Sequence, residues 1–132
     1  KYLRPTDEPI SLTDIARRFE PNNPSYLIQS WLRSRNTIEF LGEWERNNNN
    51  QFNEEAFQKL LNDVRSPSYT LTPKRWIETV NAIGLESKRG KNGGTMAHPF
   101  IACDFEMWND MQFRYDVLKY FMSSRFEMDD EE

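Results

Sequence analysis

The sequence predicts a single α+β domain that is mostly helical and carries one β-hairpin. With 132 residues, the chain has the length of one domain. Apolar residues recur at helical spacing along most of it, and this period disappears between residues 85 and 98, where a glycine-rich turn separates two short segments. Aromatic residues make up 14% of the chain, which is enough bulky material for a core that forms without a partner.

Two helices are predicted before residue 34. Ser11 can cap a short helix that contains Ile15 and ends before Pro21, and the residues ahead of it can form an edge strand. A second helix begins near Ser25, because one helical face then carries an apolar stripe. This stripe consists of Leu27, Ile28, Trp31 and Leu32.

A third and a fourth helix follow. Asn36 stands three residues before Glu39, which is the spacing of a capping box, so we expect a helix to begin there. Four asparagines at residues 47–50 indicate a helix end or a loop. The fourth helix is expected over residues 54–64, and the Ser-Pro-Ser run at 66–68 terminates it.

The fifth helix has sequence signals at both ends. Thr72 is placed to cap it, Pro73 fits its first position, and Gly84 stands where a left-handed residue often follows a helix. Residues 85–89 and 95–97 then form the strands of a hairpin with a glycine-rich tip.

Two more helices complete the predicted fold. His98 lies where the hairpin meets the first of them, and we interpret it as a capping or hydrogen-bonded structural residue. The helical period is carried by Ile101, Phe105, Trp108, Phe113, Val117, Leu118 and Phe121. We expect the core to use every strong apolar stripe, which favours a monomer, and to contain the four tryptophans Trp31, Trp44, Trp76 and Trp108.

The charges are unevenly distributed along the chain. The net charge is −4, but five of the 21 acidic residues fall in the last six positions, which leaves 16 acidic residues against 17 basic ones. We therefore expect one nearly neutral domain over residues 1–126 and a frayed acidic tail over 127–132. No run of 18 apolar residues occurs, so a membrane span is excluded, and no secretion signal is visible.

Residue counts argue against a metal site or a nucleophilic enzyme. The chain has one histidine and one cysteine, and His98 and Cys103 are five residues apart, which does not place both on one helical face. The apolar neighbours of Cys103 indicate a buried thiol. A single cysteine also fits a reducing compartment, so we expect a cytoplasmic protein.

Two further catalytic patterns are superficial. Residues 84–92 differ from a phosphate-binding loop, because five residues rather than four separate the glycines and Asn92 replaces the hydroxyl residue. Acidic pairs such as Glu43 and Glu45 are ordinary on helix surfaces. We expect no catalytic residue, no cofactor and no metal.

A basic segment between residues 74 and 91 is the strongest chemical signal. Lys74 and Arg75 oppose the dipole of the helix that they begin, so helix stability does not explain them. Lys88, Arg89 and Lys91 lie on the hairpin, whose glycine tip allows backbone amides to approach phosphate closely. These features are typical of a polyanion site, although a solvated hairpin carries similar charges.

Ordered blocks of the sequence match a known family. They are residues 11–16 (SLTDIA), 28–42 (IQSWLRSRNTIEFLG), 44–45, 48–52, 71–79 (LTPKRWIET), 81–85, 87–88, 93–95 and 97–98. Over residues 9–122 the chain resembles the KilA-N domain of phage, large DNA virus and bacterial proteins. The resemblance implies a DNA-binding domain with a fold similar to the fungal APSES domain, including a helix-turn-helix-like pair and a β-hairpin wing.

The resemblance also implies where double-stranded DNA is met, namely by the wing at residues 85–97 and by the helix at 72–83. With the basic pattern, it gives the candidate DNA-binding residues Gln29, Arg33, Arg35, Lys74, Arg75, Ser87, Lys88, Arg89, Lys91 and Asn92. We expect the three lysines of this set, together with Arg75 and Arg89, to contact backbone phosphates. Asn92 and Gln29 can pair with adenine edges, and Arg33 or Arg35 can reach guanine.

The biological role stays open between two readings. KilA-N modules often precede a second domain in antirepressor or replication-related proteins, whereas this chain ends in an acidic stretch. We expect phage- or mobile-element-related regulation in a bacterial or phage-infected cell. The alternative is an antirepressor-like adaptor that binds a protein regulator and has weak or no affinity for DNA, and the acidic end favours it slightly.

Overall fold

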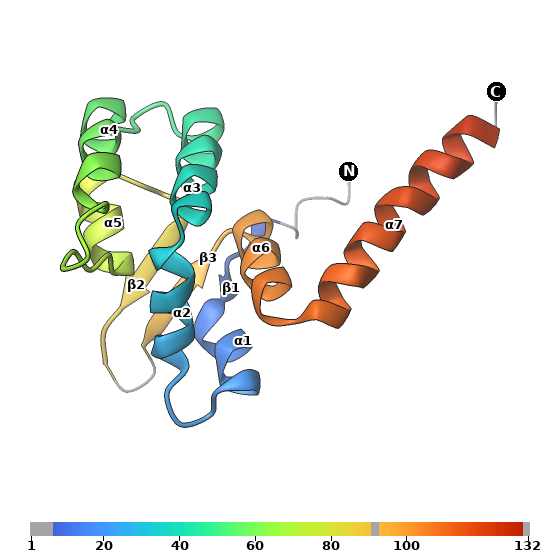
Figure 1. The fold of residues 1–132 in the computed structure, drawn as a ribbon, viewed down its shortest axis with the longest axis horizontal. Coiled ribbons are helices and arrows are strands. Elements are labelled where there is room, and N and C mark those ends of the chain that lie inside the picture. The colour runs from blue at the N-terminus through green and yellow to red at the C-terminus, as the bar shows by residue number, and fades with distance from the viewer. Residues whose placement is uncertain (1–6, 91–92, 131–132) are drawn as a thin grey trace.

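A computed structural model describes residues 7–90 and 93–130 of the chain, and these form a mostly helical α+β domain (Figure 1). Seven helices and a three-stranded antiparallel sheet occur in this part. The elements are β1 (Ile10–Ser11), α1 (Leu12–Phe19), α2 (Pro24–Arg33), α3 (Arg35–Asn48), α4 (Glu54–Asp63), α5 (Pro73–Val80), β2 (Leu85–Lys88), β3 (Gly94–Ala97), α6 (Pro99–Asn109) and α7 (Met111–Asp130). The predicted fold class is confirmed.

The sheet consists of the predicted hairpin and one very short edge strand, in the order β1-β3-β2. Lys88 pairs with Gly94 and Leu85 with Ala97, while Ile10 of β1 also pairs with Ala97. Gly94 has a φ of +149°, and a Cβ there would lie 2.5 Å from Thr13 Oγ1. Glycine is therefore required where the hairpin crosses α1.

The helix caps agree with the sequence at two positions and differ at a third. Ser11 Oγ and Thr72 Oγ1 each accept a hydrogen bond from an amide three residues later, as predicted. The predicted helix cap at Asn36 is wrong, because α3 already begins at Arg35. Glu39 pairs with Arg35 instead, with 2.6 Å between Oε2 and Nε.

The end of α5 differs from the prediction. The helix stops at Val80, and Asn81 takes the left-handed conformation with a φ of 58°. Gly84 has no positive φ and lies buried, where a Cβ would be 2.5 Å from Ile101 Cδ1 and 2.8 Å from Glu45 Oε2. Gly84 is therefore needed for space at the start of the hairpin, and its predicted left-handed role is wrong.

The core contains two of the four tryptophans. Trp31 and Trp76 are fully buried, and Trp31 Nε1 donates a hydrogen bond to Asp104 Oδ2 at 3.0 Å. Trp44 is half-buried against the core. Trp108 is 41% exposed, so the expectation that all four serve the core is wrong for this residue. His98 caps α6 as predicted, because its Nδ1 accepts from the Phe100 amide at 3.1 Å.

Helix α7 leaves the rest of the domain after α6 and projects away from it (Figure 1). Phe113 and Val117 are half-buried, whereas its other described large apolar side chains are exposed, namely Met111, Tyr115, Leu118, Tyr120, Phe121 and Met122. The premise that the core uses every apolar stripe is therefore wrong. Helix α7 runs from Met111 to Asp130, and the acidic tail over residues 127–132 stays a prediction. None of the described helices is both long and apolar enough to cross a bilayer.

Arg46 clamps α3 to the start of α4. Its Nε and Nη2 donate to Glu54 Oε1 and Oε2 at 2.7 and 2.8 Å, and Gln58 also donates to Glu54 Oε2. The hydrogen bonds from Arg46 and then Gln58 lower the pKa of Glu54 from 4.5 to about 2. A depressed pKa in the folded state stabilises the fold above pH 4.5, and this contribution is lost as the pH falls toward 2.

We therefore expect acid to destabilise the wild type more than Glu54→Gln. The side chain of Glu54 is 46% exposed, so the difference should be at most about 1 kcal/mol between pH 6 and pH 3. Urea unfolding at the two pH values measures it. Glu55→Gln, which removes a neighbouring exposed carboxylate from the same helical turn, is the charge-matched control. Equal acid sensitivity of the wild type and Glu54→Gln would contradict the prediction.

Candidate nucleic-acid interface

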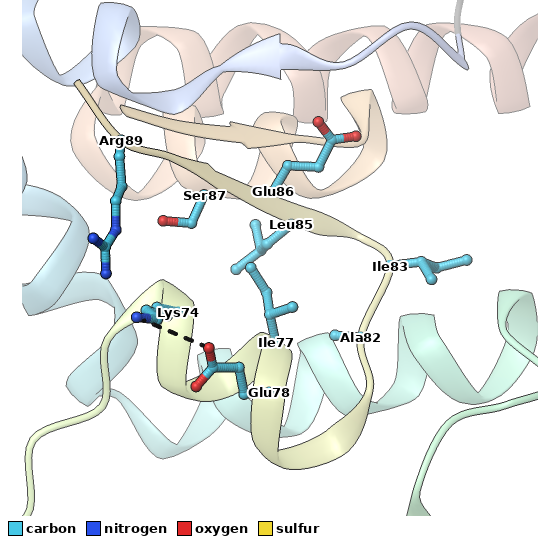
Figure 2. A pocket seen from close by; sticks show the side chains of 9 residues that line it. All are labelled: Lys74, Ile77, Glu78, Ala82, Ile83, Leu85, Glu86, Ser87 and Arg89. Atoms are coloured by element: carbon cyan, nitrogen blue, oxygen red, sulfur yellow. Dashed lines mark ion pairs between the residues drawn. The ribbon is translucent and has the colours of Figure 1, made fainter. Parts of the chain in front are cut away.

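A groove of about 450 Å³ separates α5 from β2, and side chains from both elements line it (Figure 2). Leu85, at the start of β2, is buried between the sheet and α5, and Ile77 of α5 is partly buried beside it. The lining residues are Lys74, Ile77, Glu78, Ala82, Ile83, Leu85, Glu86, Ser87 and Arg89. The groove thus has an apolar floor and charged rims.

Two predicted cations meet at one end of this groove. Lys74 lies in the first turn of α5, and Arg89 follows directly after β2. Figure 2 shows Arg89 reaching from the hairpin toward the end of the groove at which Lys74 stands. Both side chains are exposed, and Ser87 lines the same groove. The fold therefore brings two cations to one end of the groove from segments that are separate in the sequence.

Carboxylates limit the positive charge of the groove. Lys74 Nζ stands 4.0 Å from Glu78 Oε2, one helical turn away, and Glu86 lines the other rim. These two acids formally balance Lys74 and Arg89. An exposed ion pair of this length contributes little energy, so Lys74 can exchange Glu78 for another anion at small cost.

Lys88 belongs to the opposite side of the hairpin. Successive side chains of a strand point to opposite faces, and Lys88 lines a second hollow of about 370 Å³, together with Arg17, Asp14 and Ser11 of the α1 region. Arg17 Nη1 pairs there with Asp14 Oδ1 at 2.7 Å. Sequence reasoning missed Arg17, because nothing near it in the sequence indicates the hairpin beside it.

The remaining candidate residues do not line the α5–β2 groove. Arg75 Nη1 donates to Thr70 O at 3.0 Å and its Cζ lies 5.1 Å from the Tyr69 ring centroid, so its guanidinium supports the loop before α5. Arg33 lines a separate hollow of about 200 Å³ that also contains Tyr69.

Arg35 is engaged with Glu39 on α3, and Gln29 is half-buried on α2. Lys91 and Asn92 lie outside the described residues. Of the ten candidates, Lys74, Ser87 and Arg89 share one groove, and Lys88 faces another.

A buried carboxylate holds the junction between α5 and β2. Glu45 of α3 is fully buried, and its Oε2 accepts from the Gly84 amide at 2.7 Å while Oε1 accepts from the Ile83 amide at 3.0 Å. Asn49 Nδ2 donates to Glu45 Oε1 at 2.9 Å and to Asn81 O at 2.8 Å. This network fixes where the hairpin begins relative to α5.

The interpretation of Glu45 as a surface residue is therefore wrong. Ile38, Leu41 and Glu45 follow one another at i, i+3 and i+7, so helical spacing alone places Glu45 on the buried face. The spacing therefore predicts burial of Glu45, whereas its residue type, a carboxylate, favours exposure to water. The polar atoms that satisfy it come from the distant residues 81–84, which local sequence does not reveal.

The cysteine is poorly suited to nucleophilic chemistry. Cys103 is only partly buried, so the predicted buried thiol is wrong, but this partial burial, and secondarily the charges of Asp104 and Glu106, raise the pKa of its thiol and disfavour the reactive thiolate. Within residues 7–90 and 93–130, no cluster of three or more His, Cys, Asp or Glu side chains is placed to hold a metal ion.

The described residues form a small, mostly helical α+β domain in which a β-hairpin lies beside α5. The KilA-N domain family matches residues 2–124, and the chain belongs to this family. KilA-N domains are generally DNA-binding domains and are not typically enzymes. Neither the curated proteins nor the solved structures contain a match to the chain. The family resemblance over residues 9–122 is thereby confirmed.

Proposed function

We propose that this domain binds double-stranded DNA with its β2–β3 hairpin and the first turn of α5. The observation that carries the proposal is the meeting of Lys74 and Arg89 at one exposed end of the α5–β2 groove. Each is a cation that can neutralise a backbone phosphate. Ser87, which lines the same groove, can donate a hydrogen bond to a neighbouring phosphate or sugar oxygen.

The second face of the hairpin extends this contact surface. Lys88 and Arg17 lie beside one hollow there, so the hairpin offers cations on both of its sides. A hairpin that projects with cations on each side can follow the edge of a DNA groove. Gly90, which directly follows Arg89, has a φ of +102° that glycine adopts without strain, and space is open around its Cβ position. We assign the helix-turn-helix-like role to α4 and α5, which pack together ahead of the hairpin.

The proposal is tested by fluorescence-anisotropy titration of a random-sequence DNA duplex at 50 and 200 mM salt. Three to four phosphate contacts should give micromolar affinity at 50 mM salt, and a slope of log K against log salt of about −3 to −4. Undetectable binding at 50 mM salt would refute it. Phage- or mobile-element-related regulation in a bacterial or infected cell is the process that we assign to this activity.

An adaptor function is the second candidate, and the composition of the groove favours it. Ile77 and Leu85 give an apolar floor, Ile83 at the rim is 56% exposed, and two carboxylates offset the two cations. Such a groove can accept an apolar segment of a protein regulator. Failure to bind DNA would leave this function as the one that the groove supports.

A further inference from the structure

We propose that the hollow between the end of α2 and the connection from α4 to α5 is a second phosphate site, which binds DNA backbone beyond the α5–β2 groove. Arg33 supplies its positive charge, and Ser66 and Tyr69 supply hydroxyl donors. We call these three residues the Arg33 site. The inference rests on the proposed DNA binding, because its ligand is a phosphate of the same duplex.

The fold builds the Arg33 site from two segments that are distant in the sequence. Arg33 lies in the last turn of α2, whereas Ser66 and Tyr69 lie in the α4–α5 connection over residues 64–72. All three line one hollow of about 200 Å³. Buried core residues also line it, namely Leu32, Ile38 and Leu71. Because the core fixes these side chains, it also fixes the position of the hollow.

Charge distinguishes this hollow from the two beside the hairpin. The α5–β2 groove contains Glu78 and Glu86, and the hollow at Lys88 contains Asp14. None of the described residues that line the hollow of the Arg33 site is a carboxylate. A phosphate that enters this hollow therefore displaces no lining anion and is repelled by none.

The guanidinium of Arg33 is available to such a phosphate. Its side chain is exposed, and no ion pair engages it within the part of the chain that the structure describes. Arg35, two positions later, is instead paired with Glu39 at 2.6 Å. The dipole of α2 favours a cation in its last turn, so Arg33 is accommodated without a carboxylate. A guanidinium can bind a phosphate through two parallel hydrogen bonds.

Two hydroxyl groups complete the set of donors. Tyr69 is half-buried against the core and lines the hollow. Ser66 Oγ lies 3.0 Å from Ser68 Oγ, and either atom can be the donor. Ser66 can therefore accept from Ser68 and donate its own proton to an anion. Neutral hydroxyl donors of this kind are common partners of DNA backbone oxygens.

The Arg33 site adjoins the surface of the proposed DNA contact. Lys74 lines the α5–β2 groove together with Arg89, and Arg75 follows Lys74 in the first turn of α5. The Cζ of Arg75 lies 5.1 Å from the centroid of the Tyr69 ring, and Tyr69 shares its hollow with Arg33. Neighbouring residues thus lead from the groove across the start of α5 to Arg33. A DNA backbone that contacts Lys74 can follow this path.

Fluorescence anisotropy of a random-sequence duplex with Arg33→Ala tests the site. We expect about a tenfold loss of affinity at 50 mM salt, and a slope of log K against log salt that is shallower by about one. Arg35→Ala removes the same charge from an arginine that Glu39 already engages, and it should change the affinity by less than about threefold. Arg33→Lys keeps the charge and should restore the slope. Circular dichroism verifies that the variants fold.

Tyr69→Phe tests the hydroxyl donor separately. It removes only the hydroxyl group and keeps the ring beside Arg75. We expect about a threefold loss of affinity with an unchanged salt slope, because a hydrogen bond is lost and no charge is removed. An affinity equal to that of the wild type would remove Tyr69 from the site.

The outcomes separate this inference from the function on which it rests. If the wild type does not bind DNA at 50 mM salt, the proposed function itself fails. If Lys74→Ala/Arg89→Ala weakens binding but Arg33→Ala binds as tightly as Arg35→Ala, the Arg33 site is wrong and the proposed function stands. The loss in Arg33→Ala should be equal on a duplex of A·T pairs alone. A loss confined to duplexes that contain G·C pairs would indicate a guanine contact and overturn the phosphate assignment.

Discussion

Replacement of Glu45 by alanine should lower the free energy of unfolding by about 3 kcal/mol, because buried donors lose their acceptor. The amides of Ile83 and Gly84 and the side-chain amide of Asn49 all donate to this carboxylate. An unsatisfied buried donor costs about 1–3 kcal/mol, and water that enters the vacated space recovers part of the sum. Urea denaturation at pH 7 measures the loss.

Glu43→Ala is the matched control for this prediction. Glu43 is an exposed carboxylate on the same helix and pairs with Arg46 at 2.8 Å, so its removal should cost about 0.5 kcal/mol. Glu45→Gln retains one acceptor oxygen and should fall between the two. If Glu45→Ala is as stable as Glu43→Ala, the buried network does not hold the junction.

Loss of Glu45 should also loosen the hairpin. Amide hydrogen exchange at Ile83 and Gly84 reports on the junction directly, because these two amides donate to Glu45. We expect their protection to fall more than that of Ala97, whose strand pairs with both β1 and β2. Uniform loss of protection would instead indicate global destabilisation.

The double substitution Lys74→Ala/Arg89→Ala should weaken binding of a random DNA duplex on the order of 100-fold at 50 mM salt. When a phosphate contact is lost, the counterions condensed on that phosphate are no longer released on binding. At 50 mM salt this lowers the affinity about tenfold for each contact. The slope of log K against log salt should become shallower by about two. Fluorescence anisotropy at several salt concentrations measures both quantities.

Lys59→Ala/Lys119→Ala removes the same charge from α4 and α7 and is the control. Neither lysine lines the α5–β2 groove, so this variant should change the affinity by less than about threefold, through net charge alone. Lys88→Ala separately tests the second face of the hairpin, with about a tenfold loss expected. If the double variant and its control bind equally well, the contact lies elsewhere on the surface.

Local sequence signals were sufficient for most of the fold. The caps at Ser11 and Thr72 and the pairing of residues 85–88 with 94–97 depend on residues that are close in the chain, and the structure contains all three. Such features are recoverable because their hydrogen bonds span only a few residues. The predicted cap at Asn36 is wrong because α3 begins one residue earlier, at Arg35, and Glu39 pairs with Arg35 instead of closing a capping box.

The composition of the candidate site could be predicted from the sequence only in part. The basic residues of the hairpin and of α5 were visible in the sequence, but their division between two faces was not considered. Strand alternation alone separates Lys88 from Arg89, whereas the arrival of Arg17 beside Lys88 depends on how α1 packs against β3. The charge of Arg75 favours a contact with DNA. Its contact with the Tyr69 ring depends on the tertiary structure and is not visible in the sequence.

The sequence by itself determined the helices, the hairpin and the family, because these follow from spacing, caps and ordered motifs within short segments. The tertiary structure decided which charged residues lie beside each other and which apolar helix faces are covered. It buried Glu45 against residues 83–84, placed Lys74 and Arg89 beside one groove, and left most apolar side chains of α7 uncovered. Burial depends on what arrives from distant parts of the chain, and spacing within one helix shows that a face is apolar without showing what covers it.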